Sequence, residues 1–255
     1  AAIGAALGLS TLCLGHSVGL HRGIIHDAFK TSKTFRNILV GMFLLTGLGG
    51  PLSWIRVHYL RDYWQNQPEC PDYFAYHHGL LRDYYWNVHL TYVPTHAELT
   101  EIPRELANDP WLRFFERTWP LYTLALVGLF AFFGGWELVV VAVCMRVSAG
   151  IIGHWFIGFV AHKWGYMRYA IEGAAEEGRN SFVLGLASFG EGFHNNHHAY
   201  PGSARMGHAW WEFDLGWLAI RVFEFLGLVW NVQAIGRADS GKKPSAHPIG
   251  TLVGG

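Results

Sequence analysis

The sequence predicts an all-α integral membrane protein in which a few apolar helices carry a polar helical cap. Hydrophobic residues make up 51% of the 255-residue chain and charged residues only 15%, whereas an average soluble domain is about 25% charged. Four long stretches carry almost no charge, and the segments between them hold most of the charged residues. The alternative is a very aromatic soluble helical protein.

Four apolar stretches are expected in or on a membrane: residues 1–20, 37–55, 118–136 and 147–162. The second contains several glycines and Pro51, so it is either a broken membrane helix or a helix lying on the interface. The third is uncharged over about the thickness of a bilayer. We expect it to form an antiparallel pair of spanning helices with the fourth, joined by a tight turn at Gly134–Gly135.

Residues 1–236 are predicted to form a single domain, followed by a loose Gly-, Pro- and Lys-rich tail at 237–255. Within the domain, the polar segments 56–117 and 163–215 form the cap, and an apolar helix pattern returns at 217–230. The chain begins in apolar sequence without an initiator methionine, from which we expect further sequence upstream.

The distribution of charge indicates a side of the membrane and excludes one class of partner. Lys30, Lys33 and Arg36 follow the first apolar stretch, which places the cap on the cytoplasmic side by the positive-inside rule. The formal net charge is zero, so no general attraction to nucleic acid is expected. The three cysteines are widely spaced and suggest neither a disulfide framework nor a thiolate metal site.

Histidines gather at the ends of the apolar stretches and in one cap motif, GEGFHNNHH. The candidates are His21, His26, His58, His162, His194, His197 and His198. The first four follow apolar stretches that are far apart in the sequence, so the helix ends can bring them to a similar depth. The last three are spaced i, i+3 and i+4, which on a helix places their rings on one face.

This pattern points to metal binding. Neutral imidazole is the form that binds metal, and imidazole without thiolate favours iron, copper or zinc. We therefore predict that the seven rings converge on one site, with ligands enough for two metals. For any single ring the alternative is an ordinary histidine at the membrane boundary.

Three motifs, in this order, resemble those of the integral-membrane fatty acid desaturases, particularly the acyl-CoA Δ9 type: HRGIIHDAFK, AHKWG and GEGFHNNHHAYPG. The similarity extends from about residue 15 to about residue 230. It implies membrane helices under a cytosolic cap and an O2-dependent di-iron oxidoreductase that introduces a double bond into a fatty acyl chain. It also implies a membrane lipid or acyl-CoA as substrate, and a ferredoxin or cytochrome b5-type protein as electron donor.

The middle box departs from the family pattern. After W-x-x-x-H the family has H-x-x-H-H, whereas this chain has HYLRD, so Arg61 and Asp62 stand at two ligand positions. Gly158 stands where the family often has an asparagine that holds a water on one metal. A guanidinium stays protonated and cannot bind a cation, whereas a carboxylate is a good ligand for iron. The expected ligands are therefore the seven histidines and Asp62.

Three states of this site are open. It holds two irons, with Asp62 and a further histidine, His77 or His78, filling in; it holds one metal; or it holds none. The first suits a desaturase or a related histidine-box hydroxylase, because both begin with the same hydrogen abstraction. The last describes a metal-poor subunit that binds a lipid or pigment, or serves as a scaffold in a larger membrane complex. Glu191 is interpreted as a structural or supporting residue rather than the general base of a zinc hydrolase.

Overall fold

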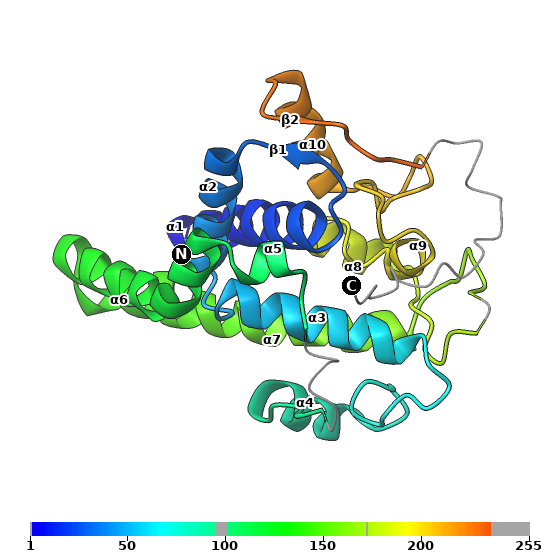
Figure 1. The fold of residues 1–255 in the computed structure, drawn as a ribbon. Helices are drawn as coiled ribbons and strands as arrows, with labels where there is room; N and C mark the ends of the chain where they lie inside the picture. The colour runs from blue at the N-terminus through cyan, green and yellow to red at the C-terminus, as the bar shows by residue number, and fades with distance from the viewer. Residues whose placement is uncertain (1, 95–100, 172, 236–255) are drawn as a thin grey trace.

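A computed structural model describes residues 2–94, 101–171 and 173–235, and the predicted tail at 237–255 lies outside these residues. The fold is mostly helical with almost no strand, as predicted (Figure 1). In chain order, its elements are α1 (Ala2–Ser10), η1 (Thr11–Ile25), β1 (Lys30–Thr31), α2 (Lys33–Leu44), α3 (Pro51–Gln65), α4 (Leu80–His89), α5 (Arg104–Ala107), α6 (Pro110–Val139), η3 (Val140–Met145), α7 (Arg146–Lys163), α8 (Phe182–Ala187), α9 (His194–Ala199), α10 (Leu215–Phe225) and β2 (Val229–Trp230).

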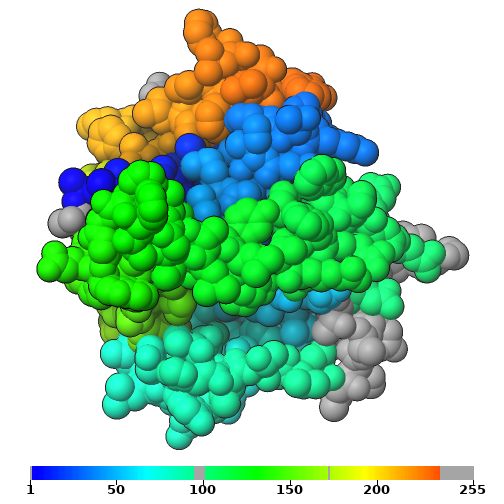
Figure 2. Space-filling view, turned by 90° about the vertical axis from the view of Figure 1, so that its left-hand side faces the viewer, coloured from blue at the N-terminus to red at the C-terminus, as the bar shows by residue number. Residues whose placement is uncertain are grey.

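Two helical stretches within the described ranges are long and apolar enough to cross a membrane, Ala2–Ile25 and Pro110–Lys163. The second reverses direction at Gly135, whose φ of 67° is accessible to glycine at little cost. This confirms the predicted antiparallel pair and its turn. Helix α6 runs across the face shown in Figure 2 and leaves large apolar side chains such as Phe132 and Phe133 exposed, as expected for a lipid-facing surface.

The second apolar stretch is divided between two helices. Helix α2 ends at Leu44, and a turn containing Gly47 and Gly49, both with positive φ, leads into α3 at Pro51. The start of α3 is fixed by Glu116 of α6, whose carboxylate accepts a 2.7 Å hydrogen bond from the Leu52 backbone N–H. A negative charge here also suits the positive end of the helix dipole.

Helix α2 packs directly on the backbone of η1, and glycine makes this approach possible. A Cβ added at Gly15 would lie only 2.3 Å from the Phe43 backbone nitrogen. The clash is with backbone, so no side chain can rotate away from it. The close contact fixes η1, and with it the histidines at its end, against α2.

We expect Gly15→Ala to destabilise the protein by at least about 1–3 kcal/mol, the usual cost of overpacking, although alanine is the better helix former. Thermal unfolding in detergent micelles measures the effect. Gly41→Ala in α2 is the matched control, because an added Cβ there meets nothing within 4 Å. Equal melting temperatures for the two variants would contradict this account of the α2–η1 contact.

The cap is tied to the end of η1 by a buried arginine. Arg22 is 0% exposed; its guanidinium donates to Asp214 at 3.0 Å and to the backbone carbonyls of Ala204 and Phe189 at 2.8 and 2.9 Å. Strand β1 also pairs with β2 near the end of the described chain. The predicted helix at 217–230 is shorter than expected: α10 ends at Phe225, because the turn at Gly227 leads into β2.

Candidate metal centre

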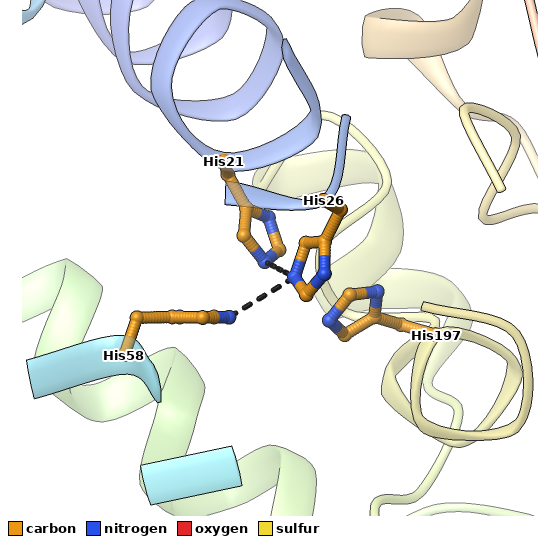
Figure 3. A group of neighbouring side chains, drawn as sticks. All are labelled: His21, His26, His58 and His197. Atoms are coloured by element: carbon orange, nitrogen blue, oxygen red, sulfur yellow. Dashed lines mark hydrogen bonds between the residues drawn. The ribbon is translucent and has the colours of Figure 1, made fainter. Parts of the chain in front are cut away.

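Four imidazoles from three parts of the fold meet in one group, as Figure 3 shows. His21 lies in η1 and His26 just after it, while His58 comes from α3 and His197 from α9. The Nε2 atom of His26 is 3.1 Å from Nε2 of His21 and 3.0 Å from Nε2 of His58. One ligand atom from each of the four rings lies within 4.8 Å of the others.

A second group of three imidazoles adjoins the first. His162, in the last turn of α7, has its Nε2 atom 3.1 Å from Nε2 of His194, which is itself 3.1 Å from Nε2 of His198. The two groups meet on α9, where the ring centroids of His194 and His197 are 5.8 Å apart. The predicted single face on this helix is therefore divided, with His197 in one group and its two neighbours in the other.

The five-residue spacing of the first motif is explained by the helix type. In an α-helix, side chains five positions apart point about 140° away from each other. Segment η1 is instead a π-helix, with i to i−5 hydrogen bonds, so positions five apart share a face. The last of these bonds runs from the His26 backbone N–H to the His21 carbonyl at 3.1 Å. The H-x-x-x-x-H spacing alone does not predict this wider helix.

The two asparagines inside the HNNHH motif hold α9 in place. Asn195 accepts hydrogen bonds from the backbone N–H groups of Arg168 and Tyr169 at 2.7 and 2.8 Å. Asn196 donates to the Met206 carbonyl at 2.8 Å. Both asparagines are 0% exposed, and a six-residue helix has little stability of its own. Sequence reasoning missed these residues, although their position between ligand candidates was a usable signal.

Glu191 contacts the first group at the ring nitrogen of His21 that does not face the other imidazoles. Its Oε2 atom lies 2.7 Å from Nδ1 of His21, and its other oxygen accepts a 2.5 Å hydrogen bond from the Ser17 hydroxyl. A carboxylate beside one ring nitrogen fixes the orientation of the imidazole and leaves the other nitrogen for a metal. The position agrees with the supporting role expected for Glu191.

The chemistry of the cluster fits a metal ion. Burial lowers the pKa of His26 to about 3 and that of His198 to about 4, so both rings are neutral near pH 7. A neutral imidazole nitrogen makes one hydrogen bond, yet Nε2 of His26 faces two other Nε2 atoms. Two imidazoles bound about 2.1 Å from one metal bring their nitrogens to about this separation.

The middle box of this chain, HYLRD, also lies beside the histidine groups. The carboxylate of Asp62 is 3.3 Å from Nε2 of His58. The substitutes expected from the sequence, His77 and His78, do not join either group, which corrects that expectation. His77 is an exposed side chain paired with Glu176 at 2.8 Å, and His78 is held 2.6 Å from Asp83.

Two cavities open beside the histidines. One, of about 240 Å³, touches His21, His58 and His194 and is otherwise lined mainly by apolar and small residues of η1 and α7. The other, of about 370 Å³, lies among α3, α4 and α7. The residues that line both are Trp54, Arg61, Tyr76, His154 and Gly158.

The fold and this site define a class: an all-α protein with membrane-type helices whose ends carry buried imidazoles suited to metal. A sequence model of the fatty acid desaturase family matches residues 1–232, and the chain belongs to that family. It is similar to an sn-1 stearoyl-lipid 9-desaturase of Anabaena variabilis, with 33% identity over 239 residues, which cover 91% of this chain and 84% of that protein.

Two further relatives are named for two kinds of acyl carrier, a membrane lipid and coenzyme A. An sn-1 stearoyl-lipid 9-desaturase of Synechocystis is 30% identical, over 86% of this chain and 67% of its own. An acyl-CoA C20 Delta5-desaturase of Anemone leveillei is 28% identical, over 86% of this chain and 69% of its own. The protein is thus a desaturase-type oxidoreductase with a lipid or acyl substrate, and its family implies iron as the cofactor.

Proposed function

We propose that the protein is a di-iron acyl-lipid desaturase that introduces a double bond at the 9 position of a membrane-lipid acyl chain. The observation that carries this proposal is the pair of adjoining histidine groups beside an apolar cavity, in a chain 33% identical to a stearoyl-lipid 9-desaturase. In the overall reaction, two hydrogens leave the acyl chain. Two electrons and two protons join them, and O2 is reduced to two waters.

The proposed ligands follow the two groups. His21, His26, His58 and His197 hold one iron, and His162, His194 and His198 hold the other. Asp62 adds an oxygen ligand. Burial raises its pKa, but the neighbouring imidazoles, His58 foremost, together outweigh burial and lower the pKa below the usual range, so the carboxyl is charged. When bound, iron would activate O2, the oxidant, for the removal of hydrogen from an unactivated carbon.

The chain's own residues position the substrate. We place the acyl chain in the 240 Å³ cavity, whose apolar wall includes Leu12, Ile25 and Ile157. Gly150 and Gly153 lie in the same wall, and their lack of a side chain leaves room for a methylene chain near the imidazoles. The apolar lining of the cavity disfavours water beside the reacting carbons.

The proposal also covers the side of the membrane, the electron donor and the extent of the domain. Lys30, Lys33 and Arg36 support a cytoplasmic position for the cap. Electrons would come from a ferredoxin or a cytochrome b5-type protein docking on that side. Residues 1–236 act as one desaturase domain.

Expression in a host without its own desaturase, followed by fatty acid analysis of the lipids, tests the function. We expect a new 9-unsaturated acid and close to two irons per purified chain, with the acid absent for His197→Ala. A hydroxylated product would favour the hydroxylase alternative. A chain without iron or product would favour the metal-poor subunit, the state for which Arg61 at a ligand position is the supporting observation.

A further inference from the structure

We infer that Arg61 and Tyr76 form a binding site for a small carboxylate-like anion, at the neck between the two cavities. The site lies beside the three-histidine group, because the Tyr76 ring stacks on His162. The role of the anion at the metal centre rests on the proposed function, whereas its binding does not.

The first argument is an uncompensated charge. Arg61 is partly buried and lines both cavities. Among the described residues, none forms a hydrogen bond or an ion pair with its guanidinium. The nearby acids have other partners: Asp62 lies beside His58, and Asp83 accepts from Trp155 and contacts His78, both at 2.6 Å. The guanidinium therefore faces the cavities without a direct partner, and an anion that enters them could pair with it.

The second argument is a second donor at the same place. The Tyr76 ring is 6% exposed and stacks on His162, with ring centroids 4.2 Å apart and an angle of 12° between the planes. Its hydroxyl has no hydrogen-bond partner in the described part of the chain. The hydroxyl lies 3.9 Å from where a Cβ at Gly158 would stand, so the glycine keeps the space before it open.

The two donors together select the charge of the ligand. A guanidinium has only donor groups, and a tyrosine hydroxyl can donate, so the pair suits an acceptor with two oxygens or nitrogens. A carboxylate has this shape, whether it is a free small anion or the end of a fatty acid. The position of Tyr76 beside His162 would bring the anion next to the three-histidine group.

Azide is a suitable probe, because its infrared stretching band reports binding. The full chain in detergent is titrated with azide, and the iron content of each preparation is measured. We expect Arg61→Met to weaken azide binding by about ten-fold or more, Arg61→Lys to restore part of it, and Tyr76→Phe to weaken it several-fold. Arg56→Met is the control, since Arg56 is on the same helix and lines a separate surface pocket.

Competition with formate and decanoate identifies the source of the carboxylate. Equal competition indicates a free anion, and much stronger competition by decanoate indicates a fatty acid; both support the site. Azide affinity in Arg61→Met within two-fold of the parent, with the fold intact by circular dichroism, would overturn it. If the parent binds no iron, the proposed function fails, and azide titration of the metal-free chain still tests Arg61.

Discussion

Replacing His26 with alanine is expected to empty the four-histidine group of iron and to abolish desaturation. The Nε2 atom of His26 contacts the Nε2 atoms of both His21 and His58, so its ring stands at the centre of the group. The loss of activity should exceed the about 10- to 100-fold typical of residues that only support a ligand. Iron per chain and unsaturated fatty acid in the host lipids are the two measurements.

His77→Ala is the matched control for this experiment. The His77 side chain is 74% exposed and contacts Glu176 rather than the cluster. We expect unchanged iron and unchanged product. Loss of iron in His77→Ala, or full iron in His26→Ala, would show that the grouping of rings described above is not the metal site.

The second large effect is expected from Glu212→Leu, which should destabilise the cap by about 3–5 kcal/mol, the cost of breaking a buried ion pair. The Glu212 side chain is 0% exposed. Its carboxylate accepts hydrogen bonds from five groups: the Tyr166 hydroxyl, the Arg168 guanidinium, the Asn196 amide, and the backbone N–H groups of His208 and Ala209. Leucine removes the acceptor that these five donors share. Because Asn196 lies within α9, iron binding should weaken as well.

Denaturant unfolding in detergent, with Glu224→Gln as control, measures this difference. Glu224 pairs with Arg221 at the exposed surface, where an ion pair contributes at most about 1 kcal/mol. Burial raises the pKa of Glu212, but the Tyr166 hydrogen bond and the other donors outweigh it, so the pKa is lowered overall. Its stabilising effect is therefore present above the unfolded pKa and lost as the pH falls. Similar stability of Glu212→Leu and Glu224→Gln at pH 7 would contradict the role of this network.

The sequence was sufficient for the features that depend on composition and on motif order. Absence of charge predicted the α6–α7 pair, and Gly135 marked its turn. The histidines predicted as ligands are those that the fold brings together. These features follow from local chemistry, which a single sequence displays directly.

Features that depend on long-range packing could not be predicted from the sequence alone. The π-helical form of η1 decides which face His21 and His26 share, and the spacing alone does not reveal it. The rings on α9 fall into two groups because His58 of α3 lies near His197, whereas His162 of α7 lies near His194 and His198. His77 and His78, the available donors in one of the three open alternatives, lie apart from both groups because Glu176 and Asp83 hold these side chains elsewhere.

Helix α9 supplies rings to both histidine groups within six residues. Asn195 and Asn196 anchor this short helix, and an ion captured by either group would restrain its rings further and so favour the bound arrangement of the other group. Uptake should then be cooperative, with the second ion bound more tightly than the first and half-loaded molecules scarce. Iron titrated below saturation would accumulate as fully loaded chains beside empty ones.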